Sequence, residues 1–347
     1  MERGHFVVMS GELEISVMQG ADAAAAVLHN LNRPAWFLAK MKPKLDELLR
    51  AHSATVFHAK NGNEPAGCAV FWKDPPHFSH GKAVPIFGWV DCPNKATFKR
   101  LMHAVETHAK EQGCEKIRGP INLPNLFGGW GVMRSGFDRP LLIDSAWNRP
   151  ELGSWYEGAG YLPVTDYVSV EVTEPLALDS PFPHIRCESY PIEELLGNEA
   201  LMGQIGAFVK ENFSSFLPDA SPASHMMELF DVLKEVDHGE DFYVLAFDDA
   251  KGGKLAAAML QVPNIFDVWS GNSLESANIN TVIVDKDYRG HDFFHWVFTQ
   301  LVLKLRKRGV TRQVGGAIWS RNKQGMYTFL RISKQVAEFC VYEKMLT

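Results

Sequence analysis

The sequence predicts a mixed α/β protein built from two tandem halves of the same design. Three observations support this fold class. The chain has 347 residues, which is more than a single hydrophobic core usually organises. A proline-rich stretch at 173–184 breaks the periodic pattern near the midpoint, as a linker would. Strand and helix patterns then follow one another in the same order on both sides. We therefore expect domains at 1–175 and 176–347.

The N-terminal half shows a strand, two helices, a hairpin, and then strands and helices in alternation. The hairpin is predicted because two runs of β-branched and aromatic residues flank the turn sequence NGNE. The last strand follows a short helix pattern around WYEGA. In chain order, we expect elements at 13–18, 21–33, 42–50, 54–60, 65–73, 83–90, 94–112, 115–121, 153–159 and 161–172.

The C-terminal half repeats this order, with a second hairpin around the turn sequence DAKGG. Glycine follows the long helix of both halves, and Gly113–Gly119 has the same spacing as Gly309–Gly315. The matching order of elements makes an internal duplication the better interpretation of this spacing. We expect elements at 184–190, 192–213, 223–236, 241–249, 254–262, 277–284, 291–308, 311–319, 322–331 and 335–346.

Composition limits the functional class. The formal net charge is −6 and the pI is about 6.1, which argues against a broad surface for nucleic acid or anionic membrane. Five scattered cysteines without a CxxC pair are typical of free thiols in a reducing compartment. The N-terminus lacks a signal-peptide pattern, and no stretch is long and apolar enough for a membrane helix. We expect a cytoplasmic protein.

The repeated order of elements resembles the acyl-CoA N-acyltransferase (GNAT) superfamily in tandem. In the C-terminal half the resemblance depends on VIVDKDYRGHDF and on Asn322, which opens the next helix. In the N-terminal half it depends on IRGPINL, SGFDRPLLIDSAWN and WYEGAGY. The resemblance implies two tandem GNAT-like domains that use acetyl-CoA or another acyl-CoA, with no metal.

The resemblance also implies a cofactor site in the C-terminal half. Members of the family bind the pyrophosphate of acetyl-CoA at the N-terminus of the helix that follows the fourth strand, where free amides and the helix dipole favour an anion. The matching residues here are Val284, Tyr288, Arg289, Gly290 and Asn322.

Two positions depart from the family pattern. Asp292 replaces a glycine, and Phe294 replaces a small residue. Asp292 would repel a phosphate, and it could cap the helix itself. A self-capped remnant of the turn therefore stays open as an alternative.

The candidate catalytic residues are divided between the two halves. In the family, a tyrosine often protonates the leaving thiolate, and a carboxylate or an ordered water accepts the proton of the amine. Tyr156 keeps the family's order in the N-terminal half. In the C-terminal half Phe329 occupies the tyrosine position, Tyr327 lies nearby, and Glu275 is the nearest acid. Plain packing of Tyr156 on the sheet is the alternative.

A glycine-rich aromatic segment at 122–140 is the candidate substrate-binding loop. Its spacing fits neither a Walker loop nor a dinucleotide fingerprint. We expect a lid that overhangs the acceptor site, with a packed surface loop as the alternative. Its candidate substrate-binding residues are Asn122, Phe127, Trp130, Phe137 and Asp138.

The expected function is N-acylation of a small amine or a peptide amine. The rival interpretation is a GNAT-like binding module that has lost CoA and uses its cleft for another ligand. A tRNA-dependent aminoacyl transferase is a third class, but the acidic charge counts against it. His291 and His295 lack a third ligand, so no metal site is predicted. The sequence leaves a homodimer open.

Overall fold

The computed structural model describes residues 13–346, except 21, 177, 178, 180, 181, 213–217, 221–223 and 291. The predicted linker at 173–184 lies partly outside the described residues. The chain divides into two units. Unit 1 comprises residues 1–167, 218–222 and 337–347, and unit 2 comprises residues 168–217 and 223–336.

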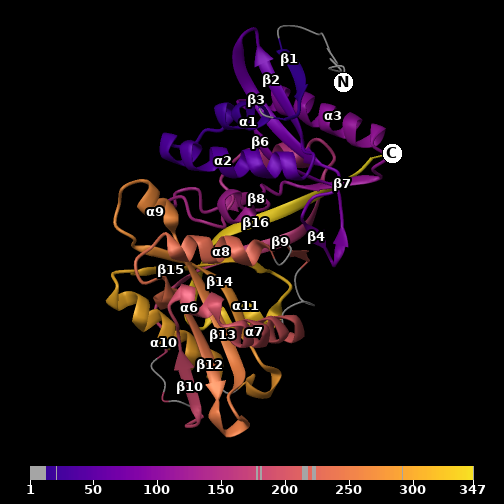
Figure 1. Cartoon of the computed structure of the whole chain (residues 1–347). Helices are drawn as coiled ribbons and strands as arrows, with labels where there is room; N and C mark the ends of the chain where they lie inside the picture. The colour runs from indigo at the N-terminus through magenta and orange to yellow at the C-terminus, as the bar shows by residue number, and fades with distance from the viewer. Residues whose placement is uncertain are drawn as a thin grey trace. The chain divides into compact units, whose positions relative to one another are not determined.

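Unit 1 is built on a mixed sheet that begins with β1, β2, β3, β6 and β7 (Figure 1). The predicted hairpin is present, since β2 and β3 pair antiparallel, and β6 and β7 run parallel. A small second sheet joins β11, β4 and β5. The elements of this unit are β1 Leu13–Met18, α1 Ala23–Asn30, α2 Ala35–Ala51, β2 Thr55–Asn61, β3 Glu64–Trp72, β4 Phe78–Ser79, β5 Lys82–Ala83, β6 Ile86–Asp91, α3 Lys95–Glu111, β7 Lys116–Gly119, α4 Asn125–Gly128, β8 Val132–Ser135, α5 Leu152–Glu157 and β11 Asp219–Ala220.

Unit 2 is built on a sheet in the order β10, β12, β13, β14 and β15. Its hairpin, β12 and β13, is antiparallel as predicted, and β14 and β15 are parallel. The elements of this unit are β10 Ile185–Glu188, α6 Ile192–Gly197, α7 Glu199–Asn212, α8 Ser224–Lys234, η1 Gly239–Phe242, β12 Tyr243–Asp248, η2 Asp249–Lys251, β13 Lys254–Pro263, α9 Ile265–Trp269, β14 Ser276–Val284, η3 Lys286–Tyr288, α10 Phe293–Lys307, β15 Arg312–Trp319 and α11 Lys323–Leu330.

The closing strand of each half is shared with the sheet of the other half. β16 (Ser333–Met345) is the last strand of the chain, yet it pairs antiparallel with β7 and β8 of unit 1, as its yellow ribbon shows in Figure 1. β9 (Leu162–Val172) ends the N-terminal half, yet its second part lies beside β15 of unit 2. There Ser169 Oγ donates to the Gly315 carbonyl at 2.7 Å. Residues 168–175 therefore belong to unit 2, although they lie in the predicted N-terminal domain. Residues 337–347 belong to unit 1, although they lie in the predicted C-terminal domain.

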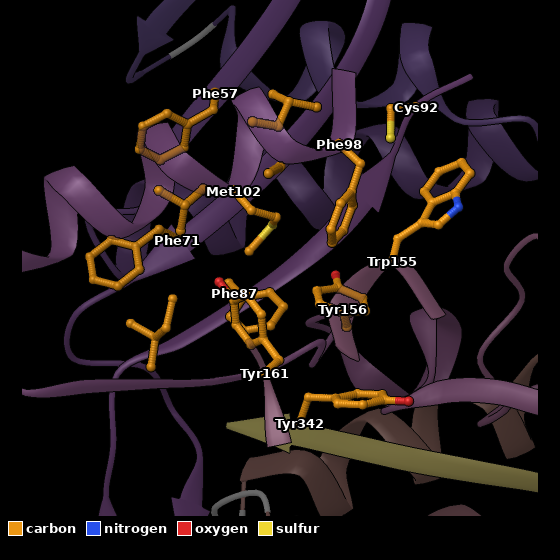
Figure 2. Close-up of a cluster of buried hydrophobic side chains, with 14 of the residues drawn as sticks. Phe57, Phe71, Phe87, Cys92, Phe98, Met102, Trp155, Tyr156, Tyr161 and Tyr342 are labelled. Atoms are coloured by element: carbon orange, nitrogen blue, oxygen red, sulfur yellow. The ribbon is translucent and has the colours of Figure 1, made fainter. Parts of the chain in front are cut away.

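The core of unit 1 is an aromatic cluster between the sheet and the helices α3 and α5 (Figure 2). The residues of α3 that face it recur at helical spacing, and Asn94 caps this helix by accepting a bond from the Thr97 amide at 2.9 Å. Tyr342 and Cys340 of β16 are fully buried in the same cluster. The last strand of the chain is therefore part of the N-terminal core. Among the described residues, no helix has the length and apolar character to cross a membrane.

Candidate functional site

The fourth main strand of each half carries an irregularity that the sequence did not reveal. On β14, the register against β13 shifts between Leu260 and Gln261, which leaves Asn280 as an extra residue. On β6, the register against β3 shifts in the same way, and Trp89 has a φ of 48°. A bulge bends its strand and ends regular pairing, and bulges are frequent beside functional sites.

Beyond each bulge, the two parallel strands of the unit separate. Among the described residues, β14 pairs with β15 only from Ser276 to Ile279. In unit 1 the pairing of β6 with β7 is reduced to the single pair Ile86–Arg118. The two halves therefore share a gap at the same point of the sheet.

In unit 2 the separated stretch is accessible, and we call residues 280–284 of β14 the open edge. Residues 276–279 are buried, but four of the five residues of the open edge are half-buried. β15 changes in the same way, from buried at 313–316 to half-buried at 317–319. Central strands of a mixed sheet are normally covered. This change in burial at the end of the pairing marks the open edge as a candidate binding surface.

The open edge also carries backbone groups that point away from β13. The Asp285 amide donates to the Ala256 carbonyl of β13 at 2.9 Å. Because peptide groups alternate along a strand, the amides of Val282 and Val284 face the opposite side, where β15 has separated. The Val284 carbonyl on that side accepts a bond from Arg289 Nε at 3.0 Å. Arg289 therefore ties the following turn to the strand.

Side chains of the β12–β13 hairpin contact the turn at residues 285–290 and stabilise it. Lys254 Nζ lies 2.8 Å from the buried Asp285 carboxylate, and Lys251 Nζ lies 4.7 Å from the centre of the Tyr288 ring. The Tyr288 hydroxyl bonds to the buried Asp248 carboxylate. Burial and this carboxylate both raise the pKa of Tyr288, so its hydroxyl stays protonated at neutral pH. Tyr288 is thus a structural support of the turn.

Asp292 and Phe294 have partners that the sequence did not predict. Asp292 occupies the N-cap position of α10 at a φ of 55°, but its side chain makes no capping bond among the described residues. The self-cap that was the alternative does not form, because the carboxylate pairs with Arg331 Nη1 at 2.6 Å instead. Phe294 packs against Phe298 and Phe329, with ring centres 5.4 and 5.2 Å apart.

The structure separates the other candidate residues of unit 2. Asn322 caps α11, since its Oδ1 accepts a bond from the Gly325 amide at 3.0 Å. Tyr327 on the same helix is 72% exposed. Glu275 is exposed and precedes β14, so the nine residues of that strand place it roughly 30 Å from the turn. Glu275 and the turn therefore cannot act on the same atom of a ligand.

In unit 1 the gap is filled by the chain itself, through residues 119–131, which we call the closing loop. The Ile121 amide donates to the Phe87 carbonyl at 2.8 Å, and Asn122 Oδ1 accepts from the Trp89 amide at 2.6 Å. Asn122 Nδ2 donates to the Gly128 carbonyl at 2.8 Å. The backbone groups of β6 that a ligand would need are therefore occupied.

The expected lid is accordingly wrong for the first part of its segment. Asn122 and Phe127 are buried, and Lys44 lies 4.9 Å from the centre of the Phe127 ring. Trp130 stacks on Tyr167 with ring centres 6.0 Å apart. Phe137 is half-buried and Asp138 is exposed, both in a turn after β8. The loop packs inward because its apolar side chains gain more from burial than from exposure.

Tyr156 lies at the centre of the aromatic cluster of unit 1 (Figure 2). It is fully buried, and its hydroxyl finds no hydrogen-bond partner among the described residues. Its ring contacts Phe87, Phe98, Tyr161 and Tyr342 at centre distances of 4.8 to 5.6 Å. Burial raises the pKa of Tyr156 well above its usual value. This position fits the packing role that was the alternative for this residue.

A buried cluster of polar side chains around Asp219 in unit 1 could not be predicted from the sequence. Asp219 is fully buried and accepts bonds from Arg118, Tyr167 and His77 at 2.7 to 3.2 Å. The partners lie far apart along the chain, so no spacing rule could have joined them. Among the described residues no group of three or more His, Cys, Asp or Glu side chains is arranged to hold a metal ion. His291, one of the two histidines considered above, lies outside the described residues.

No protein-family model and no curated protein matches the chain. Solved structures do match it. A GCN5-related glucosamine N-acetyltransferase region of a fungal multi-domain β-N-acetylglucosaminidase has a TM-score of 0.60 at 15% identity. That match covers 97% of this chain but 38% of the fungal chain.

Two further structures match over almost their whole length. A tandem GNAT protein from the clavulanic acid biosynthesis pathway has a TM-score of 0.60 at 12% identity, covering 97% of this chain and 99% of that one. A GCN5-related N-acetyltransferase from Sphaerobacter thermophilus has a TM-score of 0.56 at 13% identity, covering 98% and 97%. Similarity at these identities establishes the fold, so this chain has the mixed α/β fold of tandem GNAT acyltransferases.

Proposed function

We propose that the protein is an acyl-CoA-dependent N-acyltransferase for a small amine or a peptide amine, and that unit 2 binds the thioester. The observation that carries this proposal is the open edge of β14. Its outward amides and half-buried side chains form a strand edge to which an extended amide-containing chain, such as pantetheine, can add by hydrogen bonding.

The turn and helix that follow the open edge support the same assignment. α10 is a helix of 15 residues, so its first amides and its dipole favour an anion at its N-terminus. Gly290 has a φ of 88° and no atom within 4 Å of the position of an added Cβ, which leaves its backbone accessible. The Asp292 carboxylate, which would repel a phosphate, is partly neutralised by Arg331. The residues of unit 2 therefore fit a CoA pyrophosphate.

Unit 1 does not fit the same role. Its corresponding strand edge is bonded to Ile121 and Asn122 of the closing loop. An added Cβ at Gly88 would lie 2.0 Å from the Ile121 carbonyl oxygen, which shows how closely the loop approaches β6. We therefore assign the thioester to unit 2 alone.

The chemistry requires one proton to pass from the amine to water and one to reach the sulfur. The amine nitrogen forms a bond to the thioester carbonyl carbon, the carbon–sulfur bond breaks, and the product is an amide plus a free thiol. Acyl-CoA, when bound, supplies the activated acyl group. We propose Tyr327 as the residue that gives a proton to the thiolate, because its hydroxyl is exposed on the helix after β15. Glu275 lies before the first residue of β14, far from the turn, and Tyr156 is fully buried in unit 1. Neither residue has a part in this scheme.

A second candidate function is a non-catalytic binding module built on the same open edge. The observation in its favour is that Asp292, in place of a glycine, precedes α10, and that Phe294, in place of a small residue, packs against Phe329. Such a module would bind a ligand at the open edge without turnover.

The first experiment is a calorimetric titration of CoA and acetyl-CoA into the whole protein. Asp292→Asn removes the carboxylate charge and keeps a residue type that tolerates a positive φ, so we expect it to bind CoA severalfold more tightly. Asp231→Asn is the matched control, because Asp231 is an exposed carboxylate of α8 that pairs with Lys234. Its affinity should equal that of the wild type.

Two outcomes would decide against an acyltransferase. The absence of heat with millimolar CoA in all three proteins would leave the turn as a remnant. Binding of acetyl-CoA without transfer to any amine of a broad acceptor panel would support the binding module.

A further inference from the structure

Unit 1 contains a small cavity at the end of β6, beside the start of α3. It encloses about 30 Å³, which is room for roughly two or three water molecules. Its wall includes two tryptophans, two arginines, one aspartate and one cysteine, namely Trp89, Trp147, Arg33, Arg149, Asp91 and Cys92. The residues that line this cavity all belong to unit 1, and no function proposed above uses it.

Arg33 and Asp91, which carry opposite charges, both line the cavity. The Arg33 guanidinium lies 4.5 Å from the centre of the Trp147 ring, and it donates to the carbonyls of Asn32 and Trp147. Asp91 accepts the Asn32 amide at 3.1 Å through Oδ2. Within the described part of the chain, Arg33 and Asp91 form no ion pair, although both line the same small space.

The remaining polar side chains of the wall form no hydrogen bond to Arg33 or Asp91 among the described residues. Asn122 and Asn148 use their amide groups in bonds to the backbone. Burial raises the pKa of Cys92 to about 12, so the thiol adds no charge at neutral pH. Burial lowers the pKa of Arg33 to about 10, although the nearby Asp91 acts in the opposite direction. Arg149 adds a second cation and donates to the Pro93 carbonyl at 2.9 Å.

From this arrangement we infer that the cavity binds the zwitterionic head group of a free α-amino acid. The ammonium group would donate to Asp91, and the carboxylate would accept from Arg33, with Arg149 as a second cation near the carboxylate. The cavity has room for part of such a head group, and its open side leaves space for the rest of the ligand. The space is too small for a nucleotide, and Asp91 disfavours a simple anion. This inference concerns unit 1 and does not depend on the proposed acyl transfer.

The test is a calorimetric titration of glycine into the whole protein without CoA. Acetate and methylamine are the matched half-ligands, because each carries one of the two charged groups. We expect glycine to bind at least about tenfold more tightly than either half. Asp91→Asn, which keeps the side-chain shape, and Arg33→Gln should each weaken glycine binding by about tenfold or more.

Asp166→Asn and Arg186→Gln are the controls, because they remove exposed charges outside the cavity wall and should leave glycine binding unchanged. Thermal unfolding of each variant shows whether it is folded, and the half-ligands and Asp91→Asn still decide the question if Arg33→Gln does not fold.

Equal affinity for acetate and glycine would replace the inference with an anion site. No heat from glycine would overturn it, and the cavity would then hold water. Since CoA is absent, this result is independent of the CoA titration.

Discussion

At the scale of single residues, Asp219 is the best example of an interaction that the chain assembles from distant parts. Its two carboxylate oxygens accept from Arg118 Nε at 2.8 Å and Nη2 at 2.7 Å, from the Tyr167 hydroxyl at 2.9 Å and from His77 Nε2 at 3.2 Å. Arg118 is 3% exposed. A buried guanidinium needs this carboxylate, since an unpaired buried charge is costly.

We expect Asp219→Ala to destabilise the protein by about 3–5 kcal/mol, because it leaves the buried Arg118 with only the more distant Glu343 carboxylate, at 3.7 Å. Urea unfolding followed by circular dichroism measures the change. Asp166→Ala is the matched control, since Asp166 forms an exposed pair with Arg134 at 3.4 Å and should cost roughly 0–1 kcal/mol. Equal effects of the two substitutions would show that the buried cluster contributes no more than a surface pair.

Stability should also depend on pH through Asp219. Burial alone raises the pKa of this carboxyl, but the bonds from His77 and Arg118 outweigh it and hold the pKa well below its usual range. The stabilisation is therefore complete above the unfolded-state pKa of about 3.9 and is lost as the pH falls below it. Unfolding free energies measured between pH 6 and pH 3 should fall more steeply for the wild type than for Asp219→Asn. Parallel curves would contradict this assignment.

The proposed chemistry predicts a specific kinetic effect of replacing Tyr327. Tyr327→Phe removes one exposed hydroxyl and should lower kcat by about a hundredfold, with KM for the acyl-CoA unchanged. Steady-state kinetics with the acceptor found in the amine panel would measure both values. An unchanged kcat would remove Tyr327 from the mechanism, while the assignment of the open edge would stand.

At the scale of elements, two similar strands have different edges. β6 and β14 both carry a bulge, and each separates from its parallel neighbour. The edge of β6 is covered by the closing loop, and the edge of β14 is accessible. One half of the fold therefore leaves this strand edge accessible, and the other half covers it with its own chain.

Gly88 permits this filling of unit 1. An added Cβ would meet the Ile121 carbonyl oxygen at 2.0 Å, so we expect Gly88→Ala to destabilise the protein by about 1–3 kcal/mol. Gly197→Ala is the control, because no atom lies within 4 Å of its added Cβ. Chemical denaturation compares the two variants. An unchanged stability of Gly88→Ala would mean that the closing loop moves away from β6 at little cost.

The sequence predicted most elements because their signals are local. The hairpins and the long helices follow from periodicity and turn residues within a dozen positions of one another. The bulges at Asn280 and Trp89 could not be predicted, since an extra residue exists only relative to the register of the partner strand. The segment 122–140 was expected as a lid, but its aromatic composition does not tell whether its side chains face the solvent or the sheet.

At the scale of the whole molecule, the exchange of closing strands makes each unit depend on both halves of the chain. β16 supplies the register partners of β7 from Tyr342–Gly119 to Met345–Lys116. It also supplies Tyr342 and Cys340 to the aromatic cluster of unit 1. Without β16, β7 would lose a partner strand and the cluster would open to water.

We therefore expect fragments 1–175 and 176–347 to aggregate when each is produced alone, and to co-purify as a folded pair when produced together. Size-exclusion chromatography and thermal unfolding of the single and paired fragments test this. Tyr342→Ala in the intact chain is a milder variant of the same change, with an expected cost of about 3–5 kcal/mol. Cooperative unfolding of fragment 1–175 alone would contradict the dependence.

The sequence alone determined the fold class, the order of the elements and the turn at Tyr288, Arg289 and Gly290, because hydrophobic periodicity and turn chemistry act between near neighbours. The tertiary structure decided which strand edge stays accessible, which residues face it, and which half each closing strand completes. It also buried Tyr156 and paired Asp292 with Arg331. These outcomes depend on strand register and on contacts between residues far apart in the chain, and such contacts have no local pattern in the sequence.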